Sequence, residues 1–161
     1  MTKIKGRNVL FIVNASNRYT ITMTDIEPRN WNYYTMYIRS VIHGVMQEMG
    51  YSEDQIGQYF KMSGDTTVTK THGRKSVGGI NRMVMDAQYF GKKLEKEAKY
   101  QWELSEYLNR DICQPEGFDA NGYPSELFKL DMERLGIISK RKPAKIIDFT
   151  RYIDTNRSTN H

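Results

Sequence analysis

The chain has 161 residues, of which 39% are hydrophobic and 12% aromatic, so it can bury the core of one ordinary domain. Its net charge of +5 and pI near 9.2 permit contact with nucleic acid or with an acidic protein surface but require neither. The single cysteine, Cys113, excludes an internal disulfide and a cysteine-based metal site, and it fits a reducing cytoplasm. Because Val9–Val13 is too short for a signal peptide and no apolar run nears membrane-spanning length, we expect no membrane partner.

A β-hairpin is predicted near the N-terminus. The run Asn8–Val13 is apolar and rich in β-branched residues, Asn14–Asn17 has turn composition, and Tyr19–Met23 alternates with period two. These patterns predict a first strand buried on both faces and a second strand buried on one. A lone hairpin is only marginally stable in water, so helices should pack on it.

Two helices are predicted after the hairpin. Pro28 suits the first position of a helix, and apolar residues then recur every three or four positions as far as Met49. Gly50 stands where a helix would end. Ser52 followed by Gln55 is a capping-box pattern, which predicts a shorter helix ending near residues 63–64.

A third strand and a long helix are predicted in the middle of the chain. The segment Thr66–Lys70 is β-branched and short, as expected for a strand beside the hairpin. A helical apolar pattern then continues over residues 77–109, with Ser76 as its N-cap. The second half of this helix is charged around a narrow apolar stripe, so it should project from the core or pair with another helix.

The remaining chain is predicted to be a helical extension. Residues 113–124 contain two prolines and two glycines, which break the pattern, and Ser125 is expected to cap a helix that continues to Arg134. We therefore predict an α+β fold, with a small antiparallel sheet of two to three strands packed by helices. The predicted units are a core domain, 1–110, and a C-terminal extension, 111–161, that packs on the core or projects from it.

The stretch Thr69–Asn81 is the strongest candidate for a site. The first turn of a helix offers free N–H groups, and basic side chains around it would complete an anion site. The residues assigned to this anion or nucleic-acid site are Lys70, His72, Arg74, Lys75, Ser76 and Asn81. A second basic patch consists of Lys140, Arg141, Lys142 and Lys145. The alternative interpretation is that the cations form a solvated rim and that Gly78 and Gly79 allow close helix packing. The glycine spacing matches no nucleotide-binding signature, so no cofactor is predicted.

Catalysis is the weaker interpretation of the same stretch. A metal-independent RNase would need His72 as acid or base, Lys70 or Arg74 to stabilise charge, and Asp86 further along the helix. His43 lies beside an apolar stripe and is expected to be structural, which leaves one usable histidine outside the tail. We therefore assign no catalytic residue. Asp119–Gly122 lacks the later acidic ligand of a calcium loop and predicts a turn, so no metal site is expected.

Three stretches together resemble a known family. They read V-L-F-I-V-N-A-S-N-R-Y-T-I, then G-Y-S-E-D-Q-I, then T-V-T-K-T-H-G-R-K-S-V-G-G-I-N-R-M-V. They are similar to small bacterial proteins classed as a domain of unknown function, over roughly residues 8–95. In that family a hairpin whose first strand ends near an asparagine precedes a K-T-x-x-R-S-V-x-G-x-x-N-like segment. The matching positions here are Lys70, Thr71, Arg74, Val77, Gly79 and Asn81, with one extra residue near Lys75. The resemblance implies that this loop is the family's signature and brings no activity.

The sequence thus favours a non-enzymatic binding or regulatory protein that contacts an anionic partner, with nucleic acid as the first choice. The first alternative is a protein-interaction inhibitor that uses helix 77–109 and the C-terminal extension, such as a phage-borne or mobile-element-borne antagonist of a host nuclease or defence system. The RNase is the second alternative.

Overall fold

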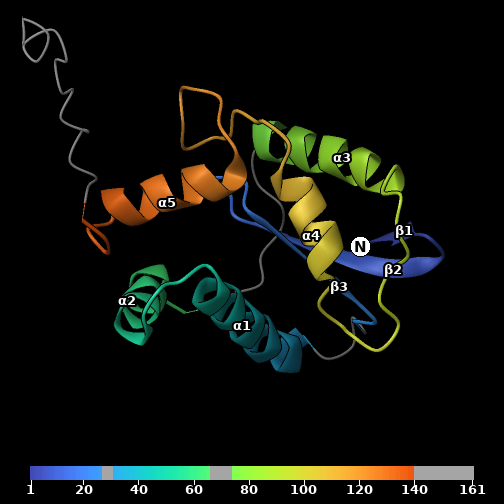
Figure 1. Ribbon diagram of the computed structural model, residues 1–161, viewed down its shortest axis with the longest axis horizontal. Helices are drawn as coiled ribbons and strands as arrows, with labels where there is room; N and C mark the ends of the chain where they lie inside the picture. Colours follow the sequence, from blue (N-terminus) through green and yellow to red (C-terminus); the bar gives the residue numbers. More distant parts are fainter. Residues whose placement is uncertain (27–30, 66–73, 140–161) are drawn as a thin grey trace, which may run out of the picture.

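The computed structural model describes residues 1–26, 31–65 and 74–139, and it shows an α+β fold (Figure 1). Three strands form one antiparallel sheet in the order β1-β2-β3. The elements in chain order are β1 (Thr2–Ile4), β2 (Arg7–Val13), β3 (Thr20–Thr24), α1 (Trp31–Glu48), α2 (Glu53–Ser63), α3 (Arg74–Gln88), α4 (Trp102–Asn109) and α5 (Pro124–Arg134). Among these elements, no helix is long and apolar enough to cross a membrane.

The predicted hairpin is confirmed as β2 and β3, which pair from Val9 opposite Thr24 to Val13 opposite Thr20. The third strand is β1 at the N-terminus, which sequence patterns did not predict. It joins β2 through Lys5 and Gly6, which both take positive φ, as a tight two-residue hairpin requires. The strand predicted at 66–70 lies outside the described residues.

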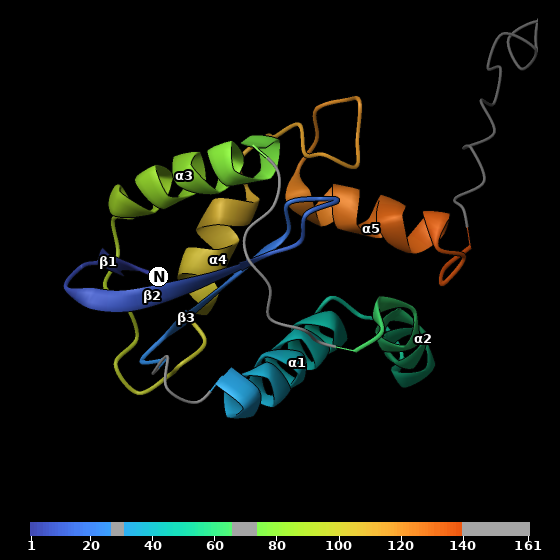
Figure 2. The same cartoon turned by 180° about the vertical axis from the view of Figure 1, so that it is seen from behind.

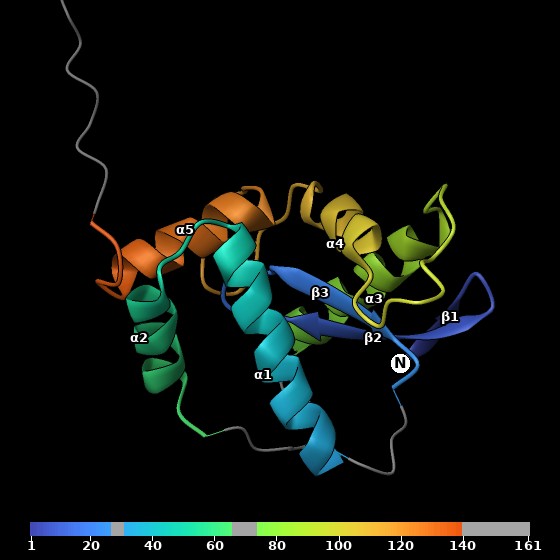
Figure 3. The ribbon, with the colours of Figure 1, turned by 60° about the horizontal axis from the view of Figure 1, so that its bottom comes forward.

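Helices cover both faces of the sheet, and Figure 3 shows α1 in front of β2 and β3 with α3 behind them. Alternate strand residues point to opposite faces, so the sheet builds two cores. One core contains Ile21 and Met23 of β3 with residues of α1, α2 and α5. The other contains Ile4 and Val9 with residues of α3 and α4. The prediction that β3 is buried on one face is wrong, because its threonines are also buried, facing α4.

The prediction of a single long helix over residues 77–109 is wrong. The chain forms α3 to Gln88, an irregular segment, and α4 from Trp102. The segment is held against the free edge of β3: the Thr24 N–H donates to the Lys99 carbonyl at 2.8 Å, and the Gln101 N–H donates to the Thr22 carbonyl at 2.9 Å. A continuous helix would leave that strand edge unpaired, so tertiary hydrogen bonds override the local helical pattern.

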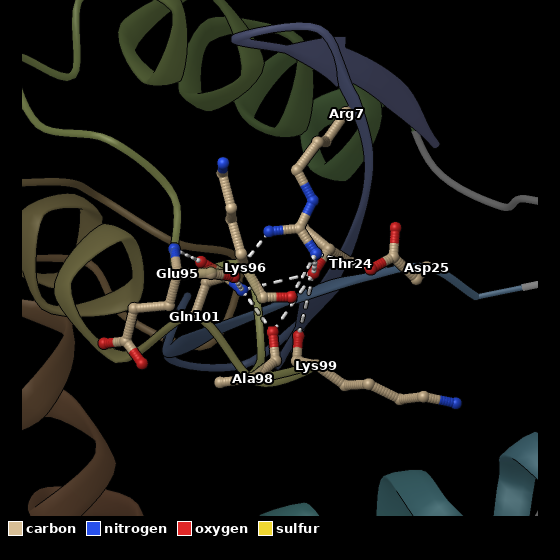
Figure 4. Close-up of polar contacts among 8 residues, drawn as sticks. All are labelled: Arg7, Thr24, Asp25, Glu95, Lys96, Ala98, Lys99 and Gln101. Carbon is tan, nitrogen blue, oxygen red and sulfur yellow. Dashed lines mark hydrogen bonds and ion pairs between the residues drawn. The ribbon is translucent and has the colours of Figure 1, made fainter.

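Side-chain hydrogen bonds fix the path of this irregular segment (Figure 4). The Gln101 amide accepts from the Glu95 N–H at 2.8 Å and donates to the Glu95 carbonyl at 3.0 Å. From the other side, the Arg7 guanidinium donates to the Glu95 carbonyl and pairs with Asp25. Because Gln101 is buried and its amide is fully engaged, the turn before α4 is rigidly tied to β2 and β3.

The predicted helix pair α1–α2 is confirmed at its junction. Gly50 takes φ of +87° after α1, and Ser52 and Gln55 form the reciprocal capping box at the start of α2. His43 lies 2.9 Å from Glu53 across the pair, in agreement with a structural role. This bond lowers the pKa of the Glu53 carboxyl.

The helix predicted near the C-terminus is α5, but Ser125 does not cap it. The helix begins one residue earlier at Pro124, a position that needs no N–H donor. Phe128 and Met132 of α5 are buried in the core shared with β3 and α1, whereas Leu130 and Leu135 are exposed. Gly136 follows with φ of +70°.

Candidate functional site

The structure describes only part of the predicted anion site. Lys70, His72 and the patch formed by Lys140, Arg141, Lys142 and Lys145 lie outside the described residues. Arg74, Lys75 and Ser76 are the first three residues of α3, so the expectation that Ser76 is the N-cap is wrong: the helix starts two residues before it. Asn81 is exposed on α3. The backbone of the motif is therefore helical from Arg74 onward, and its described part leads into Gly78 and Gly79.

A tight turn at the tip of the β2–β3 hairpin lies close to α3. The Asn14 side-chain oxygen accepts hydrogen bonds from the Ser16 N–H at 2.9 Å and the Asn17 N–H at 3.3 Å. Arg18 then closes the turn, with its N–H donating to the Asn14 carbonyl at 2.8 Å. Its φ of +67° lies in the left-handed region, which is uncommon for a residue other than glycine and is held here by the hydrogen bonds around it.

Three other elements hold this turn in place, and Figure 2 shows its tip reaching the start of α5 below the loop that precedes that helix. The buried Asn17 amide donates to Asp131 of α5 at 2.8 Å. The Asn14 amide donates to the Tyr59 hydroxyl of α2 at 3.3 Å. The Gly117 N–H donates to the Ser16 carbonyl at 3.0 Å. The direction in which Arg18 leaves the turn is thus set before any ligand arrives.

The Arg18 guanidinium lies directly on the backbone of α3 at Gly79. A Cβ atom placed on Gly79 would fall 1.5 Å from one guanidinium nitrogen of Arg18, whereas a Cβ on Gly78 would meet nothing within 4 Å. Gly79 is therefore needed for a side chain to approach, and Gly78 is open. The interpretation in which Gly78 and Gly79 allow close packing did not identify Arg18 as the group that approaches.

Arg18 and Gly79 form one wall of a cleft of about 550 Å³. The opposite wall is the loop between α4 and α5. Met83 of α3 and Leu108 of α4 form an apolar floor. The lining residues are Arg18, Gly78, Gly79, Arg82, Met83, Asp86, Leu108, Asp111, Ile112, Cys113, Gln114, Asn121 and Pro124.

The charges of the cleft are mixed and only partly paired. Arg82 is exposed and lies 4.0 Å from Asp86, one turn away on α3. Within the part of the chain that the structure describes, neither Arg18 nor Asp111 forms an ion pair. Burial raises the pKa of the Cys113 thiol, which also lines the cleft, an effect that the Arg18 charge opposes and the Asp111 charge reinforces. A ligand in this cleft would therefore meet a neutral thiol, together with a cation and a carboxylate that have no ion-pair partner among the described residues.

The described lining of the cleft combines charged side chains, amides and an apolar floor. It holds no histidine, and the described residues contain no group of three His, Cys, Asp or Glu side chains that could hold a metal ion. Asp86, assigned to the RNase alternative, does line the cleft. Its proposed partner His72 lies outside the described residues, so that alternative stays a prediction.

Sequence reasoning missed Arg18 because a lone arginine after a turn carries no periodic signal. The available indication was its place in the first stretch of the family resemblance, directly after Asn14–Asn17. The structure brings that stretch onto Gly79, which belongs to the third stretch. Two segments about 60 residues apart in the sequence thus form one wall of the cleft.

Comparison with protein families gives one match. The model of a domain of unknown function, DUF6933, matches residues 1–127. The chain belongs to this family. The match is longer than the 8–95 resemblance seen in the sequence, and it includes every residue that lines the cleft, whereas the basic patch at 140–145 lies beyond it. No curated protein and no solved structure matches the chain.

Proposed function

We propose that this member of the DUF6933 family is a non-enzymatic cytoplasmic binding protein that holds an anionic partner, first of all nucleic acid, against the Arg18–Gly79 wall. One observation carries the proposal. The Arg18 guanidinium lies at a cleft, on the backbone of a glycine, and has no carboxylate partner among the described residues. A guanidinium at a cleft presents several N–H donors in a planar fork that suits a phosphate group.

The distribution of charge along the sequence supports the same partner. Residues 140–161 contain six Lys and Arg but only two Asp, so they supply four of the five net positive charges of the chain. Lys70, Arg74 and Lys75 add a second basic run just before the glycines of α3. Such runs attract polyanions over a distance, whereas Arg18, which leaves a turn held by hydrogen bonds, would select the bound position.

The proposal is tested by fluorescence anisotropy with labelled single-stranded and duplex oligonucleotides over a range of salt concentrations. Binding should weaken as salt rises, because bound cations are released from the phosphates. Arg18→Ala should weaken binding about tenfold. It should also reduce the magnitude of the slope of log K against log salt by about one, the contribution of one phosphate contact. The double variant Lys70→Ala/Arg74→Ala tests the sequence-predicted part of the site in the same assay.

Lys61→Ala is the matched control, because it also removes one positive charge, from an exposed position on α2 across the sheet from α3. It should bind like the unaltered protein apart from a small electrostatic effect. Equal losses of oligonucleotide affinity in Lys61→Ala and Arg18→Ala would mean that binding depends on net charge alone and that Arg18 is not part of the site. Absence of binding to every oligonucleotide at low salt would overturn the proposal.

A protein partner is the second candidate, and one observation favours it. Met85 of α3 is 64% exposed, and Tyr89, four residues later in the turn that directly follows this helix, is 78% exposed. Large exposed apolar side chains at this spacing suit a helix that contacts another protein. A stable complex recovered from host lysate that is lost in Met85→Ser/Tyr89→Ser, together with no oligonucleotide binding, would favour this candidate over the first.

A further inference from the structure

The cleft presents opposite charges, and two of them are without partners in the described chain. Arg18 stands at the α3 wall and Asp111 at the loop wall, and neither lies within ion-pair distance of an oppositely charged group among residues 1–26, 31–65 and 74–139. Both charges nevertheless act on Cys113, so they lie near the same part of the cleft. A ligand that joins an anionic group to hydrogen-bond donors would satisfy both at once.

The space between these charges is apolar at its base and polar at its rim. Met83 and Leu108 are buried beneath it, Ile112 is 58% exposed beside it, and the Gln114 and Asn121 side chains line the loop wall. A cleft of about 550 Å³ is within the range that binds small organic ligands. The combination of a cation for a phosphate, an apolar floor for a flat ring and carboxylates for ring donors is the combination that a nucleotide requires.

We propose that the cleft binds one nucleotide unit, with its phosphate at Arg18, its base over Met83 and Leu108, and the donor edge of the base toward Asp111 and Asp86. This inference rests on the proposed function and refines it, since it names the ligand of the same site. The base would be read as well as the phosphate, which a general polyanion binder does not do.

The carboxylates predict which base is preferred. An ionised carboxylate only accepts hydrogen bonds. Guanine presents two adjacent donors on one edge, N1–H and the N2 amino group, whereas uracil presents a single N–H between two carbonyl oxygens. Guanine should therefore bind best and uracil worst. A good pair of hydrogen bonds to a base edge corresponds to a discrimination of about tenfold or more.

Two ligands share this chemistry, a nucleotide within a nucleic-acid strand and a free nucleotide. They differ in whether they would also contact the surface next to the cleft. A second hollow shares Arg82, Asp86, Asp111 and Ile112 with the cleft and adds Tyr107, Arg110 and Tyr123. The Tyr123 side chain is 42% exposed there and Arg110 is exposed as well. A strand would continue into this hollow and gain contacts, whereas a free mononucleotide would fill only the first cleft.

Cys113 provides the assay, because it is the chain's single cysteine and lines the cleft. Alkylation of the full-length protein by iodoacetamide is followed by intact mass near pH 8.5, where enough of a thiol of raised pKa is ionised to react. GMP, UMP, ribose 5-phosphate and inorganic phosphate are each added up to about 10 mM. GMP should slow alkylation at a concentration about tenfold lower than UMP. Ribose 5-phosphate and inorganic phosphate, which carry no base, should protect least.

Two variants separate the phosphate contact from the base contact, with far-ultraviolet circular dichroism to verify folding. Asp111→Asn keeps the shape but replaces one of the two acceptor oxygens with an NH2 donor, so it should bring the half-protecting concentrations of GMP and UMP close together. Arg18→Ala should weaken protection by both nucleotides alike. Since Asp111 also affects the thiol, each rate is compared with that of the same variant without ligand. A guanine-containing trinucleotide that protects at a concentration at least about tenfold below GMP identifies a strand, and equal protection identifies the free nucleotide.

Equal protection by GMP, UMP and inorganic phosphate would overturn the inference, as would no protection by any nucleotide. In either case, Arg18-dependent binding of oligonucleotides by anisotropy would leave the proposed function standing. Protection by GMP without any oligonucleotide binding would support the nucleotide site and contradict the proposed nucleic-acid function.

Discussion

Asn109 of α4 and Thr20 of β3 exchange two hydrogen bonds. The Thr20 N–H donates to the Asn109 side-chain oxygen at 2.8 Å, and the Asn109 side-chain amide donates to the Thr20 carbonyl at 2.8 Å. One helical side chain thus pairs with both backbone groups of a strand residue, as a neighbouring strand would. Asn109 is buried, so these groups have no access to solvent that could replace the lost partner.

The same relation recurs along the edge of β3. Ser105, one turn earlier, accepts from the Thr22 N–H at 2.9 Å, and Gln101, one turn earlier again, donates its side-chain amide to the Thr24 hydroxyl at 3.1 Å. Four helical residues rise about 6 Å, close to the advance of about 6.7 Å over two strand residues. A polar helix face therefore covers the edge strand and blocks its pairing with another chain.

We predict that Asn109→Ala destabilises the fold by about 3 kcal/mol, because it leaves the buried N–H and C=O of Thr20 without partners. Urea unfolding followed by circular dichroism measures the change. Asn81→Ala is the control, since Asn81 is exposed on α3, and it should alter the free energy of unfolding by no more than about 0.5 kcal/mol. Equal effects of the two substitutions would contradict the strand-like role of Asn109.

The sequence predicted much of the fold and little of the candidate site, for a physical reason. Hydrophobic period and capping chemistry are local, so β2, β3, α1 and α2 were found with the capping box of Ser52. The α3–α4 break was missed because its cause is non-local: Gln101 lies on a helical apolar spacing yet is buried by polar contacts with β3. Arg18 was missed for a similar reason, since its significance comes from Gly79, about 60 residues away.

Arg7→Lys is predicted to loosen the segment before α4, although it preserves charge. The Arg7 guanidinium reaches the Glu95 carbonyl, the Thr24 hydroxyl at 2.9 Å and the Asp25 carboxylate together, and a lysine ammonium has no planar fork to do so. The expected loss is about 1 kcal/mol, with faster amide hydrogen exchange confined to residues 95–101. Lys3→Arg, at an exposed position in β1, should leave the exchange rates unchanged. Uniformly faster exchange throughout the protein would instead indicate a global loss of stability.

The fold should lose stability in alkali through Tyr19. Burial, reinforced by Glu106 and Glu48, raises the pKa of Tyr19 to about 12. The unfolded chain therefore releases this proton first, near pH 10, and the stabilisation present below pH 10 is lost as pH rises toward 12. Tyr19→Phe should flatten this part of the curve in urea unfolding measured from pH 9 to 12. Burial also raises the pKa of Tyr100, so a residual slope is expected; an unchanged slope in the variant would show that Tyr19 does not contribute.

The two adjacent glycines of α3 offer the most direct test of the wall formed by Arg18. Alanine favours a helix over glycine by about 1 kcal/mol, so Gly78→Ala and Gly79→Ala should both keep or raise the stability of the fold. Only at Gly79 would the new methyl group occupy the place of the Arg18 guanidinium, and because that group ends a flexible side chain, it would move away at little cost. Gly79→Ala should therefore weaken anion binding in the anisotropy assay about as much as Arg18→Ala, whereas Gly78→Ala should bind normally. In the double variant Arg18→Ala/Gly79→Ala the two losses should not add, because both remove the same contact. Full additivity, or an equal loss in Gly78→Ala, would mean that binding depends on the glycines in some way other than by admitting Arg18.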